Sequence, residues 1–168
     1  MEVVFYNGEF IAKDDVSISS NSRSFNYGDA FFESIKIINA KPFNFSYHMK
    51  RLKIALSVLK LSDNYSPTFF QENISYLLEL NKILNGSIKI HISRNGGGRY
   101  LPESNESNLF ITTINGNAYQ NNNAISLCFY TKECKTTGSL SNIKSVNSLV
   151  SVLASIYANE NSFDNAIL

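Results

Sequence analysis

Arginine is scarce in this sequence, and its side chain can do chemistry that lysine cannot. The 168 residues include eleven lysines but only four arginines, Arg23, Arg51, Arg94 and Arg99. A chain this rich in Asn, Lys and Ile uses lysine for general surface charge. Each remaining arginine is therefore a candidate for gripping a phosphate or carboxylate with its planar guanidinium.

Two stretches combine an arginine with other residues that could form a site. RSFNYGDAFFESI begins at Arg23 and contains a glycine flanked by Tyr27 and Asp29, which suits a turn. The purely structural alternative is a turn that leads into a buried strand. In HMKRL, His48 and Arg51 lie on one face of a predicted helix. The alternative there is a solvated face above an apolar leucine stripe.

Two further stretches place a cation beside a glycine turn or an apolar helix. SRNGGGRY contains three glycines followed by Arg99. It is no P-loop, because no Lys-Ser or Lys-Thr follows; it is either plain turn chemistry or a support from which Arg99 leans over a pocket. In SNIKSVNSLVSVLA, Lys144 lies where a strand meets an apolar helix. This position suits a lysine with a lowered pKa that forms a Schiff base, or one that snorkels at a helix entrance.

The spacing of apolar residues predicts the elements that carry these stretches. Asn7-Gly8 between two apolar runs favours a type I′ hairpin. Helical spacing begins with Ser46 as the expected cap, and Ser66-Pro67 opens a second helix that ends at 85–86. The other expected elements are strands over 31–38, 43–45, 87–94, 108–114, 125–130 and 165–168, a turn over 39–42 and a helix over 146–159.

The order of these elements predicts an α+β fold made of two domains. Residues 1–115 form a complete small α+β unit, and the polar segment 116–124 is a linker. Residues 125–168 then begin a second, larger domain. Because a domain rarely finishes on a strand that has just begun, the chain is expected to be a fragment of a longer protein.

Composition excludes several classes of function. The net charge is +1, which gives no electrostatic case for binding nucleic acid or an acidic membrane. No apolar run is long enough to span a membrane, and the N-terminus has no signal-peptide pattern. The spacing of Cys128 and Cys134 fits neither a redox pair nor a zinc cluster. These features predict a cytoplasmic protein with reduced thiols and no metal site.

Taken together and in order, these stretches resemble the class IV aminotransferases, which are pyridoxal-phosphate enzymes of fold type IV. The family includes branched-chain aminotransferases, D-amino-acid aminotransferases and 4-amino-4-deoxychorismate lyases. SRNGGGRY resembles the strand and turn of the lyase members in particular. The other matching residues are Arg23, Tyr27-Gly28-Asp29, Phe32-Glu33-Ser34-Ile35, His48 to Leu52, Lys144 and the final DNAIL.

The resemblance implies a two-domain class IV fold and a role for several matching residues. Lys144 is expected to hold pyridoxal 5'-phosphate through a Schiff base and to act as the base at the substrate Cα. Arg51 is expected to grip the cofactor phosphate. Phe32 and Tyr27 would line the substrate side of the pocket. Arg99 lies where family members bind the substrate carboxylate or place a nearby pocket residue.

The resemblance also implies what surrounds these residues. Arg23 is expected to brace the turn that follows it, with its guanidinium on backbone carbonyls or a nearby acid. The family's glutamate that protonates the pyridine nitrogen would lie beyond Leu168, as would further phosphate loops, and Asn165 stands where the family often has glutamate. The implied assembly is a homodimer that acts on a small amino substrate, without nucleic acid or membrane partners.

Two activities remain within the resemblance, because lyases and transaminases of this family share Cα deprotonation as their first step. The glycine hairpin with Arg99 favours 4-amino-4-deoxychorismate lyase, which releases pyruvate and p-aminobenzoate. The reason is that an extended, ring-bearing dicarboxylate requires positive charge and room. A branched-chain or D-amino-acid aminotransferase is the alternative within the family. A degenerate, non-catalytic dimerising or binding module is the alternative from another class.

Overall fold

The structure is a computed structural model, and it describes residues 1–116, 124–135 and 137–168. The described residues form two compact units. The first holds residues 1–116 together with Ile143–Val146, and the second holds 124–135, 137–142 and 147–168. Most of the predicted linker over 116–124 lies outside the described residues. Within the described part, no helix is long and apolar enough to cross a membrane.

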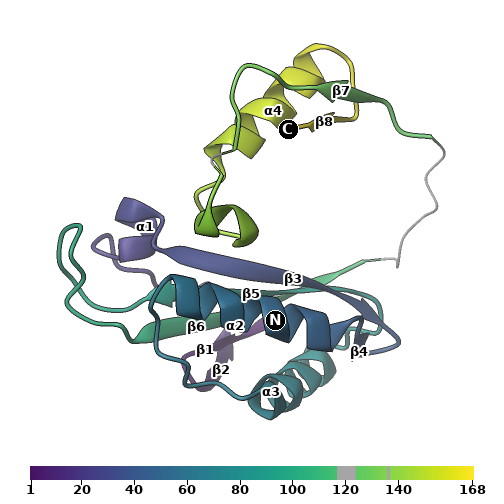
Figure 1. The fold of residues 1–168 in the computed structure, drawn as a ribbon. Coiled ribbons are helices and arrows are strands. Elements are labelled where there is room, and N and C mark those ends of the chain that lie inside the picture. The colour runs from purple at the N-terminus through teal and green to yellow at the C-terminus, as the bar shows by residue number, and fades with distance from the viewer. Residues whose placement is uncertain (117–123, 136) are drawn as a thin grey trace. The chain divides into compact units, whose positions relative to one another are not determined.

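A six-stranded antiparallel sheet forms the frame of the first unit, and α2 and α3 lie against one of its faces (Figure 1). The strands follow the order β2-β1-β6-β5-β3-β4. This arrangement confirms the predicted α+β fold. The elements are β1 (Val3–Tyr6), β2 (Glu9–Ala12), η1 (Lys13–Asp15), α1 (Arg23–Tyr27), β3 (Ala30–Ile38), β4 (Lys41–Pro42), α2 (Phe45–Val58), α3 (Pro67–Leu80), β5 (Gly86–Arg94) and β6 (Ser107–Asn115).

Residues with left-handed backbone make two tight turns at the edges of this sheet. Asn7-Gly8, with φ values of 49° and 102°, joins β1 to β2 as the sequence predicts. Asn39-Ala40, with φ values of 50° and 57°, turns β3 directly into β4. The predicted strand over 43–45 is therefore wrong. The two-residue turn starts the return strand early, so that β4 has already ended at Pro42.

The two long helices differ in how they begin. α3 begins at Pro67, as the sequence predicts, and the Ser66 hydroxyl caps it by accepting a hydrogen bond from the Phe69 N–H at 3.0 Å. α2 begins two residues earlier than predicted, and its cap is Asn44 rather than Ser46. The left-handed Asn44 (φ 53°) turns the chain into the helix, which places Ser46 inside the first turn.

Successive side chains of each strand point to opposite sides of the sheet, so its two faces carry different residues. The odd-numbered residues of β3 from 31 to 37 are buried toward α2 and α3, where all but Glu33 join one hydrophobic core with the helix side chains. The opposite face, called the far face below, carries Phe32 of β3, His91 of β5 and Phe110 of β6 in register. Lys89, two residues before His91, lies on the same face.

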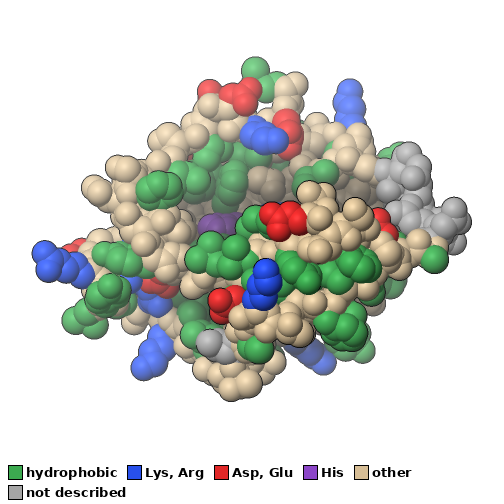
Figure 2. Space-filling view, turned by 90° about the horizontal axis from the view of Figure 1, so that it is seen from above, with side chains coloured by type: hydrophobic (Ala, Val, Ile, Leu, Met, Phe, Trp, Pro, Cys, Tyr) green, Lys and Arg blue, Asp and Glu red, His purple; other side chains and the backbone are tan. Residues whose placement is uncertain are grey.

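The second unit pairs two short parallel strands beside one helix. β7 (Leu127–Phe129) runs parallel to β8 (Asn165–Ile167), and η2 (Ser139–Asn142) precedes α4 (Leu149–Glu160). The rings of Tyr130 and Tyr157 on α4 lie 5.6 Å apart, centroid to centroid. Apolar side chains are exposed across the face drawn in Figure 2. On α4 the exposed apolar side chains are Leu149, Val152, Leu153 and Ile156.

Three predicted element bounds shift for identifiable reasons. α3 ends at Leu80 rather than at 85–86, because Lys82 already adopts a left-handed conformation (φ 55°). The strand expected over 125–130 is limited to the three residues that pair with β8. The helix expected from 146 begins at 149, because residues up to Val146 pair with β3 instead.

Replacing Ser66 with Ala should lower the free energy of unfolding by about 1 kcal/mol, because α3 loses the acceptor for its Phe69 N–H. Ser46→Ala is the matched control, since Ser46 lies inside α2 and alanine favours a helix interior. Urea unfolding followed by circular dichroism measures both variants. Equal losses of stability would contradict the assigned helix starts.

Candidate active site

The segment that carries Lys144 adds to the edge of β3. The Phe32 N–H donates to the Lys144 carbonyl at 2.9 Å, and the Val146 N–H donates to the Ala30 carbonyl at 3.1 Å. β4 pairs only with Ile37 and Ile38, so the first half of β3 has this edge available. Ile143 is buried in the hydrophobic core of the first unit. The backbone of Lys144 is thereby fixed to the sheet.

The Lys144 side chain lies over Phe32 on the far face. Its Nζ is 4.9 Å from the centroid of the Phe32 ring, and the Nζ of Lys89 is 4.3 Å from the same centroid. Both lysine side chains are exposed, and neither forms an ion pair with any residue that the structure describes. One aromatic ring thus holds two ammonium groups whose charges no carboxylate of the described residues balances.

The far face around Phe32 is basic. His91 lies opposite Phe32 in the β3–β5 register. Burial lowers the pKa of His91, and the positive charge of Lys89 lowers it further. The far-face positions of β3, β5 and β6, all of them described, carry no acidic residue. An anionic group would therefore meet positive charge and no repulsion at this surface.

On the opposite face of β3, a buried carboxylate holds two cationic side chains of α2. Glu33 is 1% exposed. Its Oε1 accepts from Arg51 Nε and its Oε2 from Arg51 Nη2, both at 2.6 Å, and Oε2 also contacts His48 Nδ1 at 2.8 Å. Hydrogen bonding to Glu33 raises the pKa of Arg51, although its partial burial opposes this. Arg51 remains 46% exposed, and within the described part of the chain its Nη1 has no partner.

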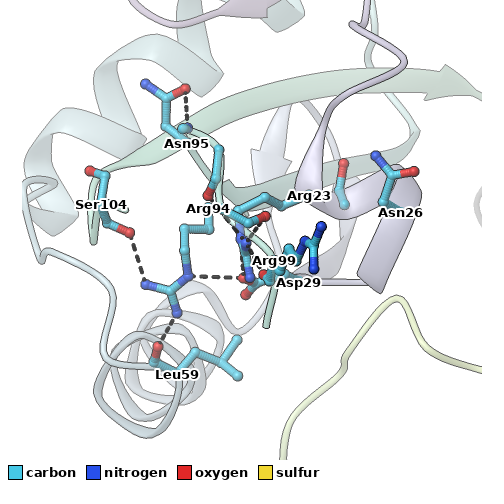
Figure 3. A network of polar contacts seen from close by, with 12 residues as sticks. Arg23, Asn26, Asp29, Leu59, Arg94, Asn95, Arg99 and Ser104 are labelled. Carbon is cyan, nitrogen blue, oxygen red and sulfur yellow. Dashed lines mark hydrogen bonds and ion pairs between the residues drawn. The ribbon is translucent and has the colours of Figure 1, made fainter. Parts of the chain in front are cut away.

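Arg23 braces the loop of SRNGGGRY as well as its own turn (Figure 3). Its Nε donates to the Asp29 carboxylate at 2.9 Å, and its Nη1 lies within hydrogen-bond distance of the carbonyls of residues 97–99. The predicted brace of the turn through a nearby acid is confirmed, and the carbonyls that Arg23 contacts belong to the loop. The Tyr27 ring lies over Arg23, 5.0 Å from Cζ, and 5.8 Å from the Tyr100 ring.

The predicted site residues fall into three local groups within the first unit. In the first group, Phe32 lies beside Lys144. In the second, Arg51 pairs with Glu33, which follows Phe32 in β3. In the third, Tyr27 lies beside the loop that carries Arg99. Their roles toward a ligand stay predictions. Among the described residues, no group of three or more His, Cys, Asp or Glu side chains could hold a metal ion.

Sequence reasoning missed Glu33, Asp29 and Lys89 as members of this arrangement. A signal for Glu33 was present: it occupies an inward position of an otherwise apolar alternation. A carboxylate at such a position needs buried cations, and the HMKRL helix supplies them. No signal in the sequence indicated the contact of Asp29 with Arg94 or of Lys89 with Phe32, because these partners come from distant segments.

Comparison with known proteins identifies the family. The family model for amino-transferase class IV matches residues 30–168. The chain belongs to the class IV aminotransferases. The predicted family is thereby confirmed, and pyridoxal phosphate is the cofactor that its members use. One similar solved structure, a T.th. branched-chain amino acid aminotransferase, contains pyridoxamine 5'-phosphate; its TM-score is 0.85 at 21% identity, over 99% of this chain and 58% of that chain.

Relatives within the class IV aminotransferases differ in activity. The D-alanine aminotransferase of Staphylococcus aureus (strain N315) is 33% identical over 94 residues, which are 56% of this chain and 33% of the relative. The aminodeoxychorismate lyase of Bacillus subtilis (strain 168) is 27% identical over 95 residues, 56% of this chain and 32% of the relative. The branched-chain aminotransferase of Thermoproteus uzoniensis has a TM-score of 0.86 at 18% identity, over 99% of this chain and 59% of that chain. The chain thus spans less than two thirds of these proteins.

Replacing Arg51 with Met should lower the free energy of unfolding by about 1–3 kcal/mol, because the buried Glu33 carboxylate loses two of its three polar contacts. Lys13→Met is the control, since it removes an exposed pair with Glu2 that contributes about 0–1 kcal/mol. Urea unfolding measures both. Adding Glu33→Leu to Arg51→Met should recover part of the loss, and equal effects of the two single variants would contradict the pairing.

Proposed function

We propose that the protein is a pyridoxal-phosphate-dependent enzyme that acts on a small amino substrate, with Lys144 as its catalytic residue. The observation that carries this proposal is the position of Lys144. Its backbone is hydrogen-bonded to β3, while its exposed ammonium lies 4.9 Å from the Phe32 ring centroid. A lysine that is fixed at its backbone and has no acidic partner among the described residues suits attachment of an aldehyde cofactor.

The residues of this chain fit the cofactor. Arg51 would bind its phosphate with the guanidinium donors that Glu33 leaves available, and Lys144 would hold its reactive carbon. When bound, pyridoxal phosphate supplies an electron sink that makes the substrate Cα proton removable. Lys144 would then take that proton as the general base, at a position that its backbone pairing sets.

The remaining site residues would bind and orient the substrate. Phe32 would form one wall of the pocket, Tyr27 would line its rim, and Arg99 would bind a substrate carboxylate. Arg99 is exposed, as this role requires. An arginine suits the role because its planar fork matches a carboxylate with two hydrogen bonds.

The best-supported substrate is 4-amino-4-deoxychorismate, which a lyase would convert to pyruvate and p-aminobenzoate for folate biosynthesis. Lys89 favours it, because an extended dicarboxylate would place a negative group on the basic far face beside Phe32. A D-amino-acid or branched-chain aminotransferase of amino-acid metabolism is the second candidate. The D-alanine aminotransferase relative, at 33% identity, favours that candidate. A non-catalytic dimerising or binding module is the third.

The likeness to the class IV aminotransferases also supports proposals about domain bounds, assembly and location. We assign residues 1–115 to a small domain, 116–124 to a linker and 125–168 to the start of the cofactor-binding domain. Residues 143–146 then reach back to the small domain, with which they cluster. A homodimer in the cytoplasm is the proposed assembly and location.

Reduction of the cofactor-loaded gene product with borohydride should leave the phosphopyridoxyl group on Lys144. Peptide mass mapping locates the modified lysine. Lys144→Arg should abolish the label, whereas Lys13→Met should leave it in place, because Lys13 only pairs with Glu2 at the surface. A label on any other lysine would remove Lys144 from the proposed mechanism.

The complete gene product should convert 4-amino-4-deoxychorismate faster than it transaminates D-alanine or leucine with 2-oxoglutarate. Lys89→Met should raise KM for the dicarboxylate about 10-fold and change KM for D-alanine less, because only the dicarboxylate would reach the far-face charge. Product assays on the wild type and the variant measure both. Turnover of D-alanine or leucine alone would favour the aminotransferase, and no turnover of any substrate would favour the non-catalytic module.

A further inference from the structure

We propose that Arg23, Asp29 and Arg94 form a positioning unit that fixes the loop over residues 95–106 and thereby sets Arg99 for the substrate carboxylate. The proposal rests on the carboxylate role of Arg99 under the proposed function. None of the three residues needs to touch the substrate. They would act through the backbone of the loop, which makes them positioning residues.

Arg23 makes an unusual set of contacts for a single nitrogen. Its side chain is 4% exposed, and Nη1 lies 3.2, 3.0 and 2.6 Å from the carbonyl oxygens of Gly97, Gly98 and Arg99. The shortest contact is to the carbonyl of Arg99 itself. Three consecutive carbonyls that converge on one buried cation fix the path of the backbone there, while the Arg99 side chain stays exposed.

Asp29 joins Arg23 to a second arginine (Figure 3). Its Oδ2 accepts from Arg23 Nε and from Arg94 Nε, each at 2.9 Å, and its backbone carbonyl accepts from the Arg94 N–H at 3.1 Å. Arg94 is 7% exposed, and its Nη1 donates to Asn105 Oδ1 at 2.8 Å. Arg94 also donates to the Leu59 carbonyl. One carboxylate thus links the outgoing and the returning arm of the loop.

The two ends of the loop are paired, whereas its tip contains three glycines. The Asn95 N–H donates to the Glu106 carbonyl at 2.8 Å, and the Ser62 N–H donates to the Asn105 carbonyl at 2.9 Å. Gly96 and Gly98 have φ values of 88° and 92°, and glycine is the residue that loses most conformational freedom when it becomes ordered. A Cβ on Gly98 would lie 2.4 Å from the Leu101 carbonyl oxygen, so the glycines permit this path. They do not enforce it. At the tip of the loop, the Arg23 guanidinium holds the carbonyls of residues 97–99, and the Glu103 N–H adds a 3.4 Å contact to the Gly97 carbonyl.

The same guanidinium also reaches the other predicted substrate residue of this region. The Arg23 Cζ lies 5.0 Å from the Tyr27 ring centroid, and Tyr27 lies 5.8 Å from Tyr100, the residue after Arg99. Arg23 therefore connects the turn that carries Tyr27 with the loop that carries Arg99. A residue that served only its own turn would not need contacts more than seventy residues along the chain.

Arg23→Lys is the informative variant. Lysine keeps a positive charge for Asp29, but its single nitrogen cannot serve both the carboxylate and three carbonyls at once. The variant protein should therefore still fold, but its loop over residues 95–106 should be less firmly held. In the complete gene product, trypsin cleavage after Arg99 should become at least 10-fold faster, and Lys13→Met should leave its rate unchanged. Unchanged cleavage after Arg99 in Arg23→Lys would overturn the proposal.

A double-mutant cycle tests the link to Arg99. Arg23→Lys should raise KM for the carboxylate substrate about 10-fold, with kcat and cofactor affinity within twofold of wild type. Arg99→Gln should raise KM at least as much, and the combined variant should match Arg99→Gln alone. If the combined variant raised KM by the product of the two single effects, the link between Arg23 and Arg99 would be overturned. An unchanged KM in Arg99→Gln would overturn the carboxylate role of Arg99 itself, and the cleavage measurement distinguishes that failure, because it needs no substrate.

Discussion

The alternation of side chains along β3 is the constraint on which the candidate site depends. Phe32 points to the far face, where it meets Lys144 and Lys89, and Glu33 points the other way and holds Arg51. Groups on opposite faces of a sheet can serve one ligand only at an edge, because neighbouring strands separate them elsewhere. β4 pairs only with Ile37 and Ile38, so the first half of β3 lies near an edge of the sheet, where only the short segment of Lys144 pairs with it.

Carboxylates of the protein itself are the partners of most of its arginines. Arg23 and Arg94 share Asp29, and Arg51 grips Glu33 with both arms of a fork. Glu33 is buried, and a carboxylate left alone there would cost several kcal/mol, so its pairing with Arg51 is obligatory. Three of the four arginines thus bind anions that belong to the protein. The exposed Arg99 is the exception.

Short sequence patterns predicted the turns and helix starts that depend only on neighbouring residues. The Asn7-Gly8 hairpin and the helix start at Ser66-Pro67 depend on a few adjacent residues, and both are confirmed. Ser46 failed as a cap because the left-handed Asn44 precedes it, a conformation that the sequence did not announce. The sequence did not predict the five-residue helix α1, because a glycine such as Gly28 (φ 64°) suits a simple turn as well as the end of a helix.

Contacts between residues that are far apart in the sequence could not be predicted from short sequence patterns. The resemblance to a family supplied the brace by Arg23, although not the loop carbonyls on which it closes. The addition of residues 143–146 to β3 could not be predicted, because the same apolar residues also suit the start of a helix. Glu33 could have been paired with Arg51 from the sequence, since its strand position demanded a cation.

The pairing of Lys144 with Phe32 has a consequence for the order in which the fold forms. The two residues are more than a hundred positions apart, whereas the hairpin of β1 and β2 closes over two residues. The entropy that a chain loses when it closes a loop grows with the length of that loop. The pairs β3–β5 and β5–β6 close shorter stretches of chain, so these strands can pair before the edge of β3 receives residues 143–146. Among the contacts of the candidate site, the one that places Lys144 closes the longest stretch of chain and has the largest entropy cost of loop closure.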